Sequence, residues 1–211
     1  MSETVLFDYW RSSASYRVRI ALNLAGIPFK VVPVDLVEGH HRSAVHLDRN
    51  PQGLVPVLDI DGLRLTQSLA IIEYLDETRR LGILPEEPSE AAKIRALAHA
   101  IALDVHPVCN LRVAKHAAAL AGGDPDELRD WMQTFIGPGL NAFEAMLDPF
   151  GQTPFCCGNT PTLADLCLIP QVYNARRWDV DLSACPKILS VESACQAHPA
   201  FAAAHPDTVR P

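Results

Sequence analysis

The pattern of hydrophobic residues changes near residue 84, and this change constrains the fold more than any other feature. Before it, short apolar runs of strand character alternate with segments of helical period; after it, almost no strand signal is present. A polar, proline-containing stretch at residues 84–89 separates the two regions. The sequence therefore predicts an α/β domain over residues 1–83, a linker at 84–89 and an all-α domain over 90–211.

The first domain is predicted to follow the order βαβ and then ββα. Right-handed crossover makes its first two strands parallel. Asp61 and Gly62 form a two-residue hairpin signal, so the last two strands are expected to be antiparallel. Pro33 indicates that the second strand lies at an edge of the sheet. We expect strands at residues 5–7, 29–36, 57–60 and 63–65, helices at 13–25 and 68–79, and a loop or short irregular helix at 37–49.

The second domain is predicted to consist of helices alone. Thr162 and Asp165 have the spacing of a capping box in front of an apolar helix, which we interpret as structural. Glycine- and proline-containing stretches punctuate the helical pattern. The expected helices cover residues 89–120, 125–147, 163–178 and 186–197.

Composition narrows the class of protein. The chain has 211 residues, of which 48% are hydrophobic and 20% charged, so it is long and apolar enough to bury a core. A net charge of -7 argues against a nucleic-acid surface, and no apolar run approaches the ~20 residues of a membrane helix. No signal peptide is evident at the N-terminus, so a cytoplasmic protein with reduced cysteines is expected. His40 and His41 have no second ligand pair at a usual spacing, and no metal site is predicted.

Two adjacent hydroxyls, those of Ser12 and Ser13, stand at the predicted start of the first helix. Unpaired backbone N–H groups and the helix dipole favour an anion there. This is a suitable place for a thiolate, but the chain supplies no thiol because residue 14 is alanine. The thiolate would therefore arrive with a ligand. The alternative is that the serines are N-caps only.

A second pair of features lies later in the same domain. A cis bond between Val55 and Pro56 would expose the backbone groups of Val55 to a ligand. Gln67 and Ser68 begin the third helical segment, where they could take a ligand carboxylate, or Ser68 could be a simple N-cap.

Several motifs, taken in order, resemble those of the glutathione transferases and most closely those of the zeta class. They are Ser-Ser-Ala-Ser-Tyr-Arg-Val-Arg-Ile-Ala-Leu at 12–22, Leu-Val-Pro at 54–56, Gln-Ser-Leu-Ala-Ile-Ile-Glu-Tyr-Leu at 67–75, Thr-Leu-Ala-Asp-Leu-Cys-Leu-Ile-Pro-Gln-Val at 162–172 and Asn-Ala-Arg-Arg-Trp at 174–178. The class signature has cysteine and tryptophan where this chain has Ala14 and Tyr16. Bacterial maleylpyruvate isomerases, which the chain also resembles, are similar in lacking that cysteine.

The resemblance implies glutathione as cofactor, with its thiolate held by Ser12 as main hydroxyl and Ser13 as neighbour. It implies a homodimer and a small keto-acid substrate whose carboxylates are bound by arginines. The residues it assigns to glutathione are His41, Val55, Gln67, Ser68, Asn110 and, more weakly, His106. Those it assigns to the substrate are Arg11, Arg112 and Arg177, with Arg176 turned away from the side that Arg177 faces.

The resemblance implies a glutathione-dependent cis–trans isomerase that converts maleylacetoacetate to fumarylacetoacetate. Maleylpyruvate is the alternative substrate, and the sequence does not distinguish the two. A broad conjugating or dehalogenating transferase and a non-catalytic glutathione-binding module remain as other interpretations. Assays with maleyl compounds and halo-acids distinguish the two isomerase activities, the broad transferase and the binding module.

Overall fold

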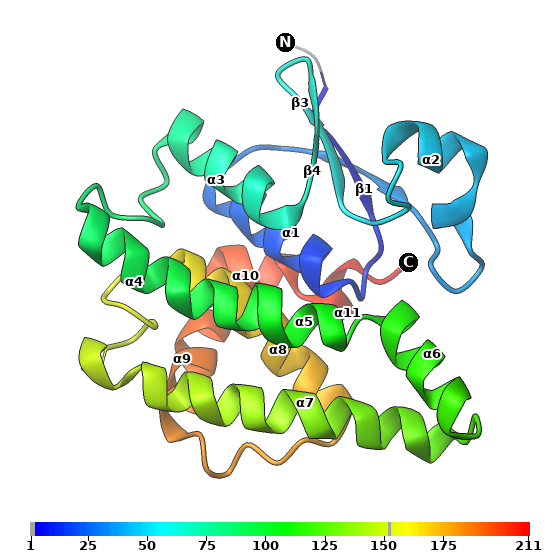
Figure 1. Ribbon diagram of the computed structural model, residues 1–211. Helices are drawn as coiled ribbons and strands as arrows, with labels where there is room; N and C mark the ends of the chain where they lie inside the picture. The colour runs from blue at the N-terminus through cyan, green and yellow to red at the C-terminus, as the bar shows by residue number, and fades with distance from the viewer. Residues whose placement is uncertain (1–2, 152) are drawn as a thin grey trace. The chain divides into compact units, whose positions relative to one another are not determined.

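The computed structural model describes residues 3–151 and 153–211, which form two compact units (Figure 1). The first unit combines Met1–Gly82 with the C-terminal segment His198–Pro211, and the second is Ile83–Ala197. The domain limits given above remain a prediction. The packing differs from them at one place, because the last 14 residues, which were expected to end the helical domain, group with the first unit.

The first unit contains a four-stranded mixed sheet with the order β2-β1-β3-β4. Strand β1 pairs in parallel with β2 and antiparallel with β3, which is antiparallel to β4, as the βαβ-ββα pattern predicts. Pro33 ends the edge strand β2, and Asp61 and Gly62 both have positive φ in the hairpin between β3 and β4. The strands are β1 (Val5–Asp8), β2 (Lys30–Pro33), β3 (Val57–Ile60) and β4 (Leu63–Thr66).

Helices cover both faces of this sheet. In Figure 1, α1 (Ser13–Leu24) and α3 (Ser68–Arg79) lie to one side of the strands and α2 (Ala44–Arg49) to the other. The alternation of side chains along β1 fits this arrangement. Asp8 contacts Arg19 of α1, whereas Phe7 lies 4.4 Å, ring centroid to guanidinium carbon, from Arg49 of α2. Within the stretch 37–49, the short helix is preceded by a turn of 3-10 helix, η1 (His40–Arg42).

The C-terminal segment is fastened to α1. It forms two short helices, α10 (Pro199–Ala204) and α11 (Pro206–Val209), which the sequence did not predict. Arg19 Nε donates to the carbonyl of Ala204 at 3.1 Å, and Asn23 Nδ2 donates to that of Ala200 at 3.0 Å. Two long side chains of α1 therefore satisfy carbonyl groups of α10.

The second unit is helical in its described residues, and no helix in residues 3–151 or 153–211 is long and apolar enough to cross a membrane. The capping box predicted before α8 is present, with the Asp165 carboxylate accepting the Thr162 N–H at 2.7 Å. The helices are α4 (Pro88–His99), the π-helical η2 (Ala100–Val105), α5 (His106–Val108), α6 (Leu111–Ala121), α7 (Pro125–Met146), the 3-10 turn η3 (Asp148–Phe150), α8 (Leu163–Arg177) and α9 (Pro186–Ala197).

The prediction of one helix over residues 89–120 is wrong. The helix changes to a π-helical form at Ala100 and ends at Val108, and a new helix starts at Leu111. Pro107 has no N–H to donate to the preceding turn, and Asn110 caps the new helix by accepting the N–H of Arg112 at 3.0 Å. The break places Asn110 at a helix start rather than within a helix.

The π-helical segment packs closely against α7 at a glycine. A Cβ built on Gly139 would lie 2.4 Å from Cγ2 of Val105, whose side chain is 6% exposed. Real Cβ atoms essentially never come that close, so a larger residue at this position would force the Val105 side chain or one of the two helices to shift.

We expect Gly139→Ala to destabilise the protein. Alanine normally stabilises a helix relative to glycine by about 0.5–1 kcal/mol, but overpacking a core costs about 1–3 kcal/mol. The clash with Val105 should therefore outweigh the helix propensity and lower the free energy of unfolding. Urea denaturation followed by circular dichroism measures the free energy of unfolding.

Gly137→Ala is the matched control in the same helix. A Cβ at Gly137 would have Val180 Cγ1 as its nearest neighbour, at an ordinary 3.7 Å. We expect this variant to be as stable as the wild type or more stable. Equal stability of the two alanine variants would contradict the proposed clash.

Candidate functional site

Ser12 is the N-cap of α1, the structural role considered above as the alternative to binding a thiolate. Its Oγ accepts the backbone N–H of Ser15 at 3.2 Å, and Ser13 is the first residue of the helix. Both serines are half-buried, and the first turn of α1 contains no acidic side chain. A serine that accepts one hydrogen bond retains its own hydroxyl hydrogen for another. Capping the helix and donating to an anion are therefore compatible for Ser12.

The start of α3 differs from the simple serine cap considered above. Gln67 is the N-cap, with φ of 68°, and its side chain makes no capping hydrogen bond; Ser68 is the first residue of the helix. The Gln67 side chain instead donates to Gln52 Oε1 at 2.8 Å. Positive φ is costly for a residue with a Cβ, and such strain is concentrated at functional sites. The Gln67 side chain therefore accepts no hydrogen bond from the free N–H groups at the start of α3.

Arg17 connects these two helix starts within the first unit. Its Nη1 donates to Ser68 Oγ at 3.3 Å, and the two residues are 2% and 7% exposed. Arg17 lies one turn after Ser13 in α1, so the N-terminal turns of α1 and α3 are joined by a buried contact. Arg17 was not among the predicted site residues, although an arginine within the apolar stretch 16–22 was a visible signal.

Val55 and His41 lie on neighbouring segments of the first unit. The bond between Val55 and Pro56 is cis, and Val55 is half-buried. A Cβ on Gly53 would come within 3.1 Å of the His41 carbonyl oxygen, so the loop before Val55 passes close to η1. Burial, followed by the charges of Arg42 and His46, lowers the pKa of His41, which favours its neutral form.

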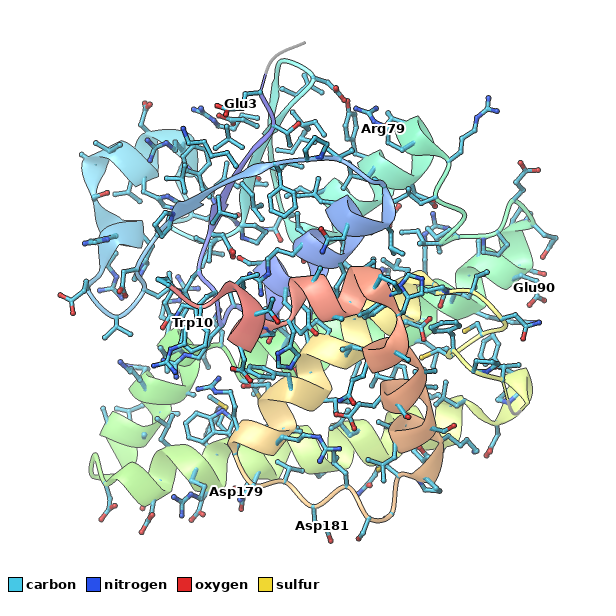
Figure 2. All side chains as sticks on the ribbon, turned by 180° about the vertical axis from the view of Figure 1, so that it is seen from behind. Glu3, Trp10, Arg79, Glu90, Asp179 and Asp181 are labelled. Carbon is cyan, nitrogen blue, oxygen red and sulfur yellow. The ribbon has the colours of Figure 1, made fainter. Side chains whose placement is uncertain are left out.

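Arg11 lies beside two aromatic side chains just before Ser12. Its guanidinium donates to the Tyr9 hydroxyl at 3.2 Å and lies 4.7 Å from the centre of the Trp10 ring. Arg210 approaches the same ring at 5.1 Å, and Figure 2 shows Trp10 beside the C-terminal segment. Stacking on aromatic rings restrains a guanidinium while leaving its charge available to an anion.

In the second unit, His106, Asn110 and Arg112 lie around the break between α5 and α6. His106 begins α5, Asn110 caps α6, and the Arg112 side chain is exposed. Trp131 of α7 donates its indole N–H to the carbonyl of Val108 at 3.0 Å. This contact, which the sequence did not predict, fixes the end of α5 immediately before Asn110.

Arg177 ends α8, and its neighbour Arg176 has a different partner. Arg176 forms an ion pair with Glu192 of α9, with Nε to Oε1 at 2.8 Å. Arg177 donates to Asn174 Oδ1 at 3.2 Å and is exposed. Gln133 of α7 donates to the carbonyl of Trp178 at 2.7 Å, so one turn of α7 holds both the Val108 and the Trp178 segments.

The cysteines of this chain are poor candidates for a nucleophile. All six are free, and burial raises the pKa of Cys109 to about 11 and that of Cys157 to about 12. A thiol with such a pKa is almost wholly protonated at neutral pH and therefore weakly nucleophilic. Among the described residues, no group of three or more His, Cys, Asp or Glu side chains could hold a metal ion.

Family models match a segment in each half of the chain. Residues 2–77 match the glutathione S-transferase N-terminal domain, and residues 129–204 match the glutathione S-transferase C-terminal domain. The chain is 61% identical over 211 residues to maleylacetoacetate isomerase of Rhizobium meliloti, covering 100% of this chain and 99% of the relative. It is 41% identical to maleylpyruvate isomerase of a Ralstonia species, with 95% and 96% covered.

Solved structures agree with these relatives. A bacterial maleylpyruvate isomerase, described as a glutathione S-transferase in the zeta class, matches with a TM-score of 0.93, 40% identity and 98% of both chains covered. A maleylacetoacetate isomerase from Methylobacterium extorquens AM1 with bound malonate and GSH matches with a TM-score of 0.91, 39% identity and 97% of both chains covered. The chain belongs to the glutathione S-transferase family and, within it, to the zeta class.

Proposed function

We propose that this protein is a glutathione-dependent cis–trans isomerase that converts maleylacetoacetate to fumarylacetoacetate. The observation that carries the proposal is the 61% identity, over the whole chain, to a maleylacetoacetate isomerase. Maleylpyruvate is the second candidate substrate, favoured by the TM-score of 0.93 with a maleylpyruvate isomerase. Two further parts of the proposal are a homodimeric assembly, which comes from the resemblance alone, and a cytoplasmic location, which comes from the N-terminal sequence.

The residues of the first unit fit glutathione. Ser12 has a hydroxyl hydrogen to donate, Gln67 makes no side-chain capping hydrogen bond at the N-terminus of α3, and Val55 supplies a backbone N–H. We assign Ser12, with Ser13 beside it, to the thiolate, the Val55 backbone to the peptide of glutathione, Gln67 and Ser68 to a carboxylate, and His41 to its glycine end. When bound, glutathione supplies a thiolate that adds to the cis double bond, permits rotation and leaves again.

Ser12 and the helix end are sufficient to ionise a bound thiol. Lowering the pKa of a thiol by about two units takes about 2.7 kcal/mol. A charge-assisted hydrogen bond contributes about 1.5–3 kcal/mol, and a helix N-terminus contributes up to about 2 kcal/mol. Ala14 therefore leaves this part of the chemistry intact.

The arginines are assigned to the carboxylates of the substrate. Arg11, Arg112 and Arg177 can each bind a carboxylate through two parallel N–H groups, and their charge stabilises an enolate. Asn110 and, more weakly, His106 are assigned to glutathione. These roles rest on the resemblance of the motifs around each residue.

A side-by-side assay of maleylacetoacetate and maleylpyruvate, each with and without glutathione, tests the proposed function. A larger kcat/KM for maleylacetoacetate, lost without glutathione, would support the first substrate, and the opposite ratio would support the second. Turnover of dichloroacetate but of neither maleyl compound would indicate a broad transferase. Binding of glutathione without any turnover would indicate a binding module.

We expect Ser12→Ala to reduce kcat/KM by about ten- to hundredfold near neutral pH, the loss of one charge-assisted hydrogen bond. Removing the donor raises the pKa of the bound thiol. The difference in kcat/KM between the variant and the wild type should therefore shrink as pH rises, because the thiol becomes ionised in both proteins. The ultraviolet absorbance of bound thiolate, followed against pH, measures this shift directly. Unchanged absorbance and unchanged rate would remove Ser12 from the mechanism.

Ser12→Thr is the control for capping. Threonine keeps both the hydroxyl and the cap to the Ser15 N–H, whereas alanine loses the cap at a cost of about 0.5–2 kcal/mol in stability. We expect the threonine variant to retain most activity. Equal losses in the two variants would show that the hydroxyl itself is unimportant.

We expect Arg177→Ala to raise KM for the keto-acid substrate by about tenfold or more, the effect of losing one ionic hydrogen bond. The affinity for glutathione should change by less than about twofold, because the substitution removes a contact to the keto-acid substrate and none to glutathione. Steady-state kinetics with each ligand varied in turn measures both values.

Arg176→Ala is the neighbouring control. It breaks the ion pair with Glu192, which is 7% exposed, so we expect a loss of stability with little change in either KM. A larger effect of Arg176→Ala than of Arg177→Ala on substrate KM would contradict the assignment.

A further inference from the structure

We propose that His46 is a positioning residue that, together with Asn50, aims the backbone N–H of Val55 at glutathione. The inference rests on the proposed function, since it concerns how the protein prepares one of the assigned contacts. It adds two side chains to the site, and both act through the peptide before Val55 and not by contact with the ligand.

Both side chains bind the same carbonyl group. His46 Nε2 lies 3.0 Å from the Leu54 carbonyl oxygen, and Asn50 Nδ2 donates to that oxygen at 2.9 Å. The two residues are 1% and 3% exposed, so water does not compete for these bonds. A carbonyl oxygen only accepts, so His46 must carry its hydrogen on Nε2.

This pair of bonds fixes the peptide plane before Val55. In a trans peptide the C=O and the following N–H point in opposite directions, and in the described chain only the Val55–Pro56 bond is cis. The Leu54 carbonyl points inward to His46 and Asn50, so the N–H of Val55 must point away from them. Within residues 3–151 and 153–211, that N–H donates to no backbone carbonyl.

Asn50 also sets the course of the loop that leads to this peptide. Its Oδ1 accepts the N–H of Gln52 at 3.1 Å, and its carbonyl accepts the N–H of Gly53 at 2.9 Å. Its own N–H donates to the His46 carbonyl at 2.9 Å, which connects the loop to α2. The peptide between Leu54 and Val55 is therefore held before any ligand arrives, and preorganisation of this kind reduces the entropy lost on binding.

The test compares His46→Phe with His46→Gln. Phenylalanine keeps a ring but removes the donor, whereas glutamine supplies an amide N–H near the position of Nε2. We expect His46→Phe to weaken binding of S-methylglutathione, measured by calorimetry, by about two- to tenfold, the effect of one misdirected hydrogen bond. His46→Gln should recover most of the affinity.

Two readouts separate positioning from general packing. The 15N-labelled wild type should show a shift of the Val55 amide resonance on adding S-methylglutathione, and this shift should be reduced in His46→Phe. KM for glutathione should rise while kcat at saturating glutathione and KM for the maleyl substrate stay within about twofold. If His46→Phe fails to fold, Asn50→Asp provides the same test, because it keeps the acceptor for Gln52 and replaces the donor to Leu54.

The wild-type titration separates a failure of the proposed function from a failure of the role of His46 and Asn50. Failure of the wild type to bind S-methylglutathione would overturn the proposed function. Binding by the wild type with equal affinity in His46→Phe and Asn50→Asp would overturn only the role of His46 and Asn50. Equal losses in His46→Phe and His46→Gln would assign the effect to shape rather than to the donor, and would also overturn it.

Discussion

The buried ion pair between Arg19 and Asp8 is the contact on which the architecture of the first unit depends. Arg19 Nη1 lies 2.9 and 2.7 Å from the two carboxylate oxygens, and the side chains are 1% and 3% exposed. The same guanidinium donates to the carbonyls of Trp10 at 2.9 Å and Ala204 at 3.1 Å. One side chain thus joins β1, the loop before α1 and the C-terminal segment. Breaking such a pair leaves a buried charge, at a cost of about 3–5 kcal/mol.

This arrangement also fixes the helix start at which we propose that a thiolate binds. The Trp10 carbonyl held by Arg19 lies two residues before Ser12, and the Ser12 N–H donates to the carbonyl of Tyr9 at 2.8 Å. The turn from Tyr9 to Ser12 is therefore held at two points, which fixes the backbone that carries the Ser12 hydroxyl. A fixed donor loses little entropy when it meets a charge, so preorganisation can replace a more reactive side chain. On the role that we propose for Ser12, its hydroxyl and the helix end act on the thiol without the cysteine that the class signature has at residue 14.

Local patterns predicted the parts of the fold whose cause is local. Asp61 and Gly62 require a tight hairpin, and the helix at Ser68–Arg79 has the predicted bounds. The C-terminal segment was missed because the groups that hold it, on Arg19 and Asn23, are more than 170 residues away. The break at Asn110 was missed for another reason: the helical period continued through it and outweighed the local signals of proline and asparagine.

The same distinction separates the site residues that were predicted from those that were not. Val55 was proposed from its own motif. His46 was missed because it lies in a polar stretch interpreted as a loop or short irregular helix, and nothing in the sequence shows that its ring reaches the Leu54 carbonyl. A carbonyl oxygen has two lone pairs, and His46 and Asn50 use both. The oxygen edge of that peptide is consequently saturated from inside the protein. Only the N–H of this peptide remains for a ligand. The orientation of the peptide therefore depends on His46 and Asn50, and the motif around Val55 does not reveal it.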